Sequence, residues 1–178
     1  MPKVAAPIKF KAKLHRPAEG GDWTFLHLPQ GASDQLPTRS MVSVEGTMNG
    51  FPFAATLQPD NNGGHWLKVE PAWSKALPGD EVECEIAPAK VEPEPDVPAD
   101  LLEALAANPT AMAVWADTTA VARRDWITWM NQGKQAETRR IRMEKMIDML
   151  ANGKRRVCCF DRSGMASKAF YCPAAAED

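Results

Sequence analysis

The side chains with the clearest capacity for chemistry are the arginines and lysines between residues 123 and 156. This stretch holds ten basic and four acidic residues, a net charge of +6, in a chain of 178 residues whose net charge is −2. Arginine binds phosphate and carboxylate groups through two parallel N–H donors. The residues that we select as a candidate site for an anionic ligand or a partner protein are Arg139, Arg140, Lys154, Arg155 and Arg156.

The same charges allow two other interpretations. At helical spacing Arg140 can pair with Glu144 four residues later, and such pairs are typical of a solvated helix face. The second of these interpretations is that this basic part of the chain binds nucleic acid. The whole chain does not favour it, because residues 1–98 carry a net charge of −4 and residues 99–178 only +2.

Residue patterns typical of enzymes are missing from the sequence. GxSxG, HExxH, GxxxxGK[ST] and GxGxxG do not occur. Glu81, Glu83 and Glu85 alternate, which is typical of a solvated strand edge rather than of a paired acid and base. The only argument for an enzyme that acts on a small molecule is that ligands generally prefer the interfaces between domains. We therefore expect no catalytic residue, no cofactor, and a binding protein rather than an enzyme.

The cysteines and histidines do not have the spacing of a metal site. The four cysteines form no CxxC pair, and the three histidines lie far in the sequence from Cys158, Cys159 and Cys172. Cys158 and Cys159 are adjacent, which is poor geometry for a disulfide or for two ligands of one zinc ion. Either thiol could be activated by the three preceding cations, or the pair could belong to an apolar docking segment.

Two aromatic groups could bind a ligand but have a simpler structural role. His65 and Trp66 could form a binding corner, and we favour instead that they cover one end of a barrel. Trp115, Trp126 and Trp129 could form a stacking cage, and we favour instead that they pack in a helical core.

The first half of the chain has the two-residue alternation of β-strands. The predicted strands lie at 8–14, 22–28, 41–48, 51–58, 64–70 and 81–87. Asn49 and Gly50 separate two of them and predict a tight hairpin, since both residues accept positive φ. Val82, Cys84 and Ile86 should point inward. Six short strands in fewer than 90 residues favour a small closed barrel, because closure removes exposed edges.

The second half has the 3.6-residue period of helices. Pro98 is placed at the first position of a helix that carries Leu101, Leu102 and Leu105, and Asn108-Pro109 ends it. A short helix is predicted at 110–116, and a third at 119–132 with Thr118 as its cap. The last helix, at 135–152, carries an apolar stripe of Met143, Met146, Ile147 and Leu150 and ends at Asn152-Gly153.

These patterns predict an α+β protein with two domains. Residues 1–87 form a small antiparallel β-barrel, and residues 99–156 form a separate helical bundle. The prolines and glutamates of residues 88–98 predict an extended linker between them. Residues 157–178 are predicted to dock on a core, with a frayed end at 173–178.

The distribution of apolar residues gives an expectation for location. The longest apolar run, Ala111–Ala116, is far shorter than the roughly 20 residues that span a bilayer. The first residues alternate and carry lysines, unlike the continuous apolar segment of a signal peptide. We expect a cytoplasmic protein that does not insert into a membrane.

Longer segments of the sequence resemble two known families. VSVEGTMNGFPFAATLQPDNNGGHWLKV, followed by LPGDEVECEIAP, resembles a small β-barrel domain of unknown function found at the N-terminus of many bacterial proteins. The segment from Val97 to Arg155 resembles the helical domain of the YdeI/OmpD-associated, or bacteriocin-protection, family. Its recognisable core is RRDWI at 123–127, then Lys134, then ETRRI at 137–141.

The resemblance implies a role more than a mechanism. It suggests a bacterial binding or adaptor protein in bacteriocin or antimicrobial-peptide tolerance, a form of stress tolerance. It supplies no catalytic residue and no identified partner. Nucleic-acid binding by the helical domain is the alternative function.

Overall fold

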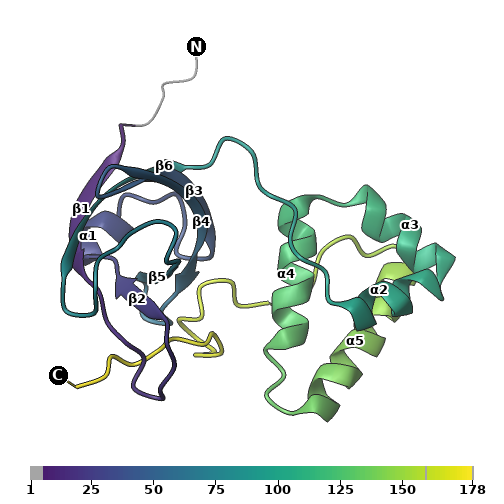
Figure 1. The fold of residues 1–178 in the computed structure, drawn as a ribbon. Coiled ribbons are helices and arrows are strands. Elements are labelled where there is room, and N and C mark those ends of the chain that lie inside the picture. Colours follow the sequence, from purple (N-terminus) through teal and green to yellow (C-terminus); the bar gives the residue numbers. More distant parts are fainter. Residues whose placement is uncertain (1–5, 159, 178) are drawn as a thin grey trace. The chain divides into compact units, whose positions relative to one another are not determined.

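The computed structural model describes residues 6–158 and 160–177, and it divides into two compact units. One unit comprises residues up to Lys90 together with those from Asp161 onward, and the other comprises Val91–Phe160. The barrel, the helices of the second unit and the yellow C-terminal segment can be followed in Figure 1. None of the described helices is long and apolar enough to cross a membrane.

The first unit contains a nearly closed antiparallel barrel, as the sequence predicts. Its described strands are β1 (Ile8–Lys13), β2 (Thr24–His27), β3 (Val42–Met48), β4 (Phe51–Pro59), β5 (His65–Val69) and β6 (Glu81–Pro88). The order is β1-β6-β3-β4-β5-β2, and hydrogen-bonded neighbours are antiparallel. An isolated bridge between His15 and Phe25 links the chain after β1 to β2.

The barrel core follows from the alternation of apolar and charged residues. Along β6, Val82, Cys84 and Ile86 are buried, as predicted, and lie opposite the inward residues of β1. On the outer face Lys11 pairs with Glu83 at 3.6 Å. Burial of the Cys84 side chain raises the pKa of its thiol to about 12, so this cysteine behaves as a small apolar residue.

The predicted hairpin between β3 and β4 is confirmed. Met48 pairs with Phe51, and the two residues between them have positive φ, 48° at Asn49 and 82° at Gly50. Two consecutive positive φ values are the geometry of a type I′ turn, whose twist matches that of the strands. The asparagine also accepts a 2.9 Å hydrogen bond from the backbone N–H of Glu83 through Oδ1. The turn is therefore tied to β6.

One short helix in the first unit was not predicted. Helix α1 (Gln30–Ser33) follows Pro29 and has no side-chain cap. A four-residue helix is too short to show an apolar period, so the sequence gives no signal for it. Its Ala32 and Ser33 are buried in the barrel unit.

Within the described residues, the second unit contains four helices: α2 (Ala99–Ala106), α3 (Pro109–Asp117), α4 (Ala120–Asn131) and α5 (Ala136–Ala151). Helix α5 contacts the other three. The helical core contains Leu101, Leu105, Trp126, Met130, Met146 and Leu150, each fully buried. The predicted stripe is wrong at Leu102, whose side chain is 46% exposed.

The helix boundaries correct two predictions, and they show a cap at Asn108, which the sequence predicted only as the end of the preceding helix. Asn108 caps α3 by accepting a 3.1 Å hydrogen bond from Ala111 N, with Pro109 at the first helical position. Pro98 is the N-cap of α2 rather than its first helical residue. The cap of α4 is Thr119, which accepts a 3.1 Å hydrogen bond from Ala122 N, and not Thr118. Two adjacent threonines are chemically equivalent caps, so the sequence could not choose between them.

The C-terminal segment lies against the barrel. Ala175 forms an antiparallel bridge with Pro17, and Ala18 N and Ala176 N donate 2.8 Å hydrogen bonds that flank it. Earlier in the segment, the Asn61 side chain donates to the carbonyl oxygen of Phe170 through Nδ2 and accepts from its N–H through Oδ1. Residues 174–176 are thus held by backbone hydrogen bonds, where the sequence predicts fraying.

Candidate functional site

The candidate basic segment, residues 154–156, follows the end of α5. The helix ends at Ala151 with Asn152 as its C-cap, as the sequence predicts. The backbone N–H of Gly153 donates to the carbonyl oxygen of Leu150 at 2.9 Å, and that of Lys154 to Met149 at 3.0 Å. The chain therefore leaves the helix in a defined direction.

The middle residue of the segment is fixed by helices α3 and α4. The carbonyl oxygen of Arg155 accepts a 3.0 Å hydrogen bond from Thr118 Oγ1 and a 3.2 Å hydrogen bond from Trp126 Nε1. Its guanidinium pairs with the carboxylate of Asp117 and donates to the Asp117 carbonyl. The backbone of Arg155 is therefore held against the helical core, and its charge is balanced locally.

The two flanking cations have a different environment. The side chains of Lys154 and Arg156 are exposed, and neither makes an ion pair or a side-chain hydrogen bond within residues 6–158 and 160–177. The fixed Arg155 backbone thus presents two available positive charges one residue on either side of it.

Arg139 lies in the first part of α5, and its side chain binds other residues of the helical unit. It pairs with the carboxylate of Asp100 at the start of α2, and its Nε donates to Asn131 Oδ1 at 3.0 Å. The hydrogen bonds from Arg139 hold the pKa of Asp100 below its usual value. This arginine joins α2, α4 and α5 and is not available to a ligand without losing those bonds.

Arg140 shows the local pairing that the sequence allowed. Its guanidinium pairs with Glu137 three residues before it and with Glu144 four residues after it. The hydrogen bond from Arg140 lowers the pKa of Glu137. Arg140 and its two partners all lie on the solvated side of α5. Arg139 and Arg140 lie in the first turns of α5, whereas residues 154–156 follow its C-terminal end, so the structure does not bring the two groups together.

The charge of the helical unit as a whole is zero. Residues 91–160 contain ten basic and ten acidic residues, and six of the acidic ones precede residue 118. Two of these come from the proline-rich stretch, where Glu94 pairs with Arg123 at 2.7 Å and Glu92 pairs with Arg124. The acidic stretch thus neutralises the start of α4, and the +6 window does not produce a basic field over the unit.

The His65-Trp66 pair is internal to the barrel unit. Both side chains are buried, and His65 Nε2 donates to the Ser40 carbonyl oxygen at 2.9 Å while Nδ1 lies 3.2 Å from Ser33 Oγ. Trp66 Nε1 donates to the Tyr171 carbonyl oxygen at 3.2 Å. Burial lowers the pKa of His65. These contacts support the structural interpretation over a binding corner.

The tryptophans of the helical unit also have structural partners. Trp115 and Trp126 are buried, and the Trp126 and Trp129 rings lie 6.3 Å apart at an angle of 78°. The half-buried Trp129 ring is covered by Arg142, whose Cζ lies 5.3 Å from its centroid and whose Nη1 donates to the Trp129 carbonyl oxygen at 2.7 Å. A stacking cage at Trp129 would have to displace this arginine.

The remaining candidates concern cysteines and metals. Cys158 is exposed, and Cys159 lies outside the described residues. In the part of the chain that the structure describes, no three His, Cys, Asp or Glu side chains are arranged to hold a metal ion.

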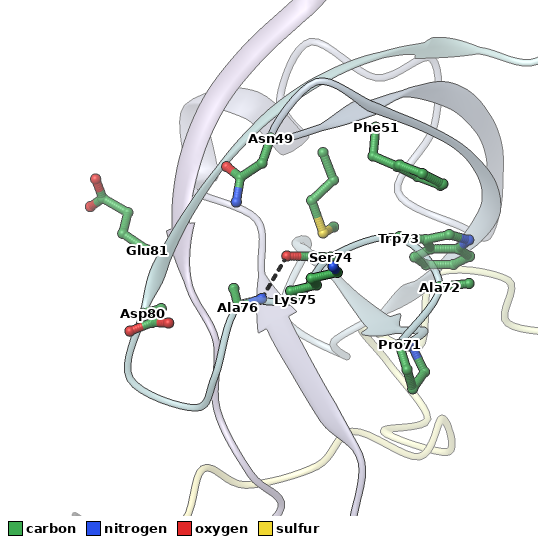
Figure 2. A pocket seen from close by; sticks show the side chains of 11 residues that line it. Asn49, Phe51, Pro71, Ala72, Trp73, Ser74, Lys75, Ala76, Asp80 and Glu81 are labelled. Atoms are coloured by element: carbon green, nitrogen blue, oxygen red, sulfur yellow. Dashed lines mark hydrogen bonds between the residues drawn. The ribbon is translucent and has the colours of Figure 1, made fainter.

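Sequence reasoning missed a hollow at one end of the barrel. It is lined by residues of the β3–β4 hairpin, the β5–β6 loop and the start of β6, including Phe51 and Trp73 (Figure 2). The only sequence signal was a tryptophan in a loop rich in proline and alanine between two strands. That pattern does not distinguish a core residue from a binding residue.

Together the two units define the class of protein: a small antiparallel β-barrel joined to a four-helix unit, with the end of the chain returning to the barrel. Residues 94–153 match the family described as bacteriocin-protection, YdeI or OmpD-associated, and residues 10–86 match a domain of unknown function, DUF1905. The two matches confirm the resemblances found in the sequence, of the helical unit to the bacteriocin-protection, YdeI or OmpD-associated family and of the barrel to the domain of unknown function. No curated protein matches the chain significantly.

Proposed function

We propose that the protein is a non-enzymatic binding or adaptor protein in bacteriocin or antimicrobial-peptide tolerance. Its helical unit would capture an anionic group of a partner at Lys154 and Arg156. The family description supports the process. The observation that carries the binding surface is the anchoring of the Arg155 carbonyl by Thr118 and Trp126, between two exposed cations that have no described partner.

The anchoring matters because binding is costly when the binding group must first be ordered. Ordering a flexible side chain or loop reduces affinity, and a preformed backbone removes part of that cost. Lysine and arginine at fixed backbone positions could contact the same carboxylate or phosphate group. Arg139 and Arg140, which belonged to the candidate site in the sequence, contribute less to this proposal because their guanidinium groups are already paired.

The test compares two double variants with the same loss of charge. Lys154→Ala/Arg156→Ala removes the proposed site, and Lys134→Ala/Lys145→Ala removes two other exposed cations of the same unit. Both should fold normally, because exposed charges contribute little to stability. We expect only the first variant to lose partner capture in a quantitative pull-down and to fail to restore bacteriocin tolerance in a strain that lacks the gene. Equal behaviour of the two variants would refute the proposal.

Nucleic-acid binding is disfavoured by the zero net charge of residues 91–160. Affinity for nucleic acid depends on the release of counterions and falls steeply with salt. A gel-shift titration with labelled DNA and RNA at two salt concentrations separates the two functions. A salt-sensitive shift that disappears in Lys154→Ala/Arg156→Ala would replace the adaptor proposal with the nucleic-acid one.

A further inference from the structure

The first arginine of α4 is held in place by the end of α3. Arg123 Nη1 donates to the carbonyl oxygens of Trp115 at 3.0 Å and Thr118 at 2.7 Å. These carbonyls lie at the C-terminal end of α3, where backbone acceptors lack partners within the helix. The Arg123 side chain is only 14% exposed. Its guanidinium therefore has a fixed position that does not depend on an acidic side chain.

The other donors of this guanidinium form a two-pronged site for one carboxylate. Nε donates to Glu94 Oε2 at 3.1 Å, and Nη2 donates to Glu94 Oε1 at 2.7 Å. Two parallel N–H bonds to one carboxylate give this contact geometric specificity as well as strength. The next residue, Arg124, pairs with Glu92. Two adjacent arginines of α4 therefore each bind a carboxylate.

Both carboxylates come from one segment, residues 91–97, whose sequence is VEPEPDV. The segment belongs to no helix or strand, and no backbone–backbone hydrogen bond joins it to the rest of the described chain. Its prolines lack the N–H that such bonds would need. The Glu94 side chain is 66% exposed, and Val91 is 81% exposed. The polar contacts that hold the segment on α4 are therefore those of its two glutamates.

A contact of this kind is exchangeable. Ion pairs that reach solvent contribute little free energy, because water and salt screen them. The segment occupies the site because its tether gives it a high effective concentration there, of about 1 mM. A ligand with the same chemistry competes with it, and the apparent affinity of that ligand is reduced according to the fraction of chains in which the site is covered.

From these features we infer that Arg123 and Arg124 form a binding site for an acidic, proline-containing segment of a partner protein, and that residues 91–97 cover this site in the free chain. The chain's own segment shows the chemistry that fits, which is two carboxylates in alternate positions on a backbone stiffened by proline. Prolines keep such a peptide extended before it binds, which lowers the cost of ordering it. The site does not use Lys154 or Arg156, so it can exist whether or not those cations capture a partner.

The test is an NMR titration of the full chain with a synthetic peptide of sequence VEPEPDV. The protein carries Glu92→Gln/Glu94→Gln, which removes both covering carboxylates and keeps the shape of the side chains. The peptide should shift the side-chain Nε–H signal of Arg123. A segment held at about 1 mM that covers the site in about nine chains of ten corresponds to a dissociation constant of about 0.1 mM for the free peptide. The natural chain should bind the peptide about tenfold more weakly.

Matched controls separate this site from general charge attraction. The peptide VQPQPDV keeps the shape of the first peptide without its two glutamates and should leave the Arg123 signal unmoved. In the same protein background, Arg123→Lys should weaken binding at least fivefold, because lysine cannot form two parallel bonds to a carboxylate. Arg140→Lys changes an arginine that is also paired with two glutamates, and it should bind normally. Urea denaturation checks that both variants are folded.

Four results would count against the site. Equal binding of the two peptides, or no shift of the Arg123 signal at about 2 mM peptide, would overturn it. Equal loss in Arg123→Lys and Arg140→Lys would show charge attraction without a local site. Equal affinity of the natural chain and the glutamine variant would mean that residues 91–97 do not cover it. A natural chain that is dimeric in sedimentation and monomeric as Glu92→Gln/Glu94→Gln would assign the site to a second copy instead of a partner protein.

Discussion

The hydroxyl of Thr118 donates a 3.0 Å hydrogen bond to the carbonyl oxygen of Arg155, which lies 37 residues later in the chain. Thr118 is buried and follows the last residue of α3, whereas Arg155 follows the end of α5. This bond joins the ends of two helices and fixes the segment that carries Lys154 and Arg156.

Thr118→Val should lower the free energy of unfolding by about 1 kcal/mol, because valine keeps the shape of threonine and removes the hydroxyl donor. Trp126 still donates to the same carbonyl oxygen, which limits the loss. Urea denaturation checks the value. Thr110→Val, at an exposed position of α3, is the control and should change stability by less than about 0.5 kcal/mol. Equal losses in the two variants would show that the bond to Arg155 contributes nothing.

Gly46→Ala should destabilise the barrel by about 3 kcal/mol or more. A Cβ atom at Gly46 of β3 would lie 1.8 Å from the carbonyl oxygen of Glu85 on β6, and backbone cannot move aside cheaply. Gly31→Ala is the matched control, since its Cβ would meet nothing within 4 Å. Thermal unfolding followed by circular dichroism compares them. A Gly46→Ala protein as stable as Gly31→Ala would mean that β3 and β6 are further apart than described.

Much of the barrel could be predicted because its signals are local. Val82, Cys84 and Ile86 alternate with glutamates, and Asn49-Gly50 has the backbone freedom that a two-residue hairpin requires. The start of α3 at Asn108-Pro109 and the end of α5 at Asn152-Gly153 also follow from local residues. In each case the residues that determine the structure are neighbours in the sequence.

The candidate site could be predicted only in part, because its chemistry depends on distant partners. Nothing near Arg124 in the sequence indicates that Glu92 pairs with it, and Asp117 lies 38 residues from Arg155. A count of charges in a window therefore selects Arg139 and Arg155 as readily as Lys154 and Arg156. Only the fold shows which of these cations are already paired.

Cys84 and Cys158 should differ in their reaction with iodoacetamide. The Cys84 thiol is buried in the barrel and its pKa is raised to about 12, whereas Cys158 is exposed. The thiolate is the reacting form, so Cys84 should stay unlabelled at pH 8 in the folded protein. Peptide mapping in a Cys159→Ser background assigns the label, and labelling in urea should reach both thiols. Rapid labelling of Cys84 without urea would contradict its burial.

The stability of the protein should fall as the pH is lowered from 7 to 5, in part through His65. Burial lowers the pKa of His65 below its ordinary value of 6.5. Below pH 6.5 the unfolded chain then binds more protons than the folded chain, so acid favours unfolding. Each such group contributes a slope of at most about 1.4 kcal/mol per pH unit.

His65→Gln tests this contribution, because it removes the titrating group and leaves a side chain that can still donate to the Ser40 carbonyl oxygen. The variant should be less stable at pH 7, but its unfolding free energy should fall less between pH 7 and pH 5 than that of the natural protein. Urea denaturation at several pH values gives the two slopes. Carboxylates with lowered pKa values, such as those of Asp100 and Glu137, lose their contribution mainly below pH 5 and add little in this window. Identical slopes would mean that His65 titrates in the folded barrel as it does in the unfolded chain, which its buried contacts with Ser33 and Ser40 should prevent.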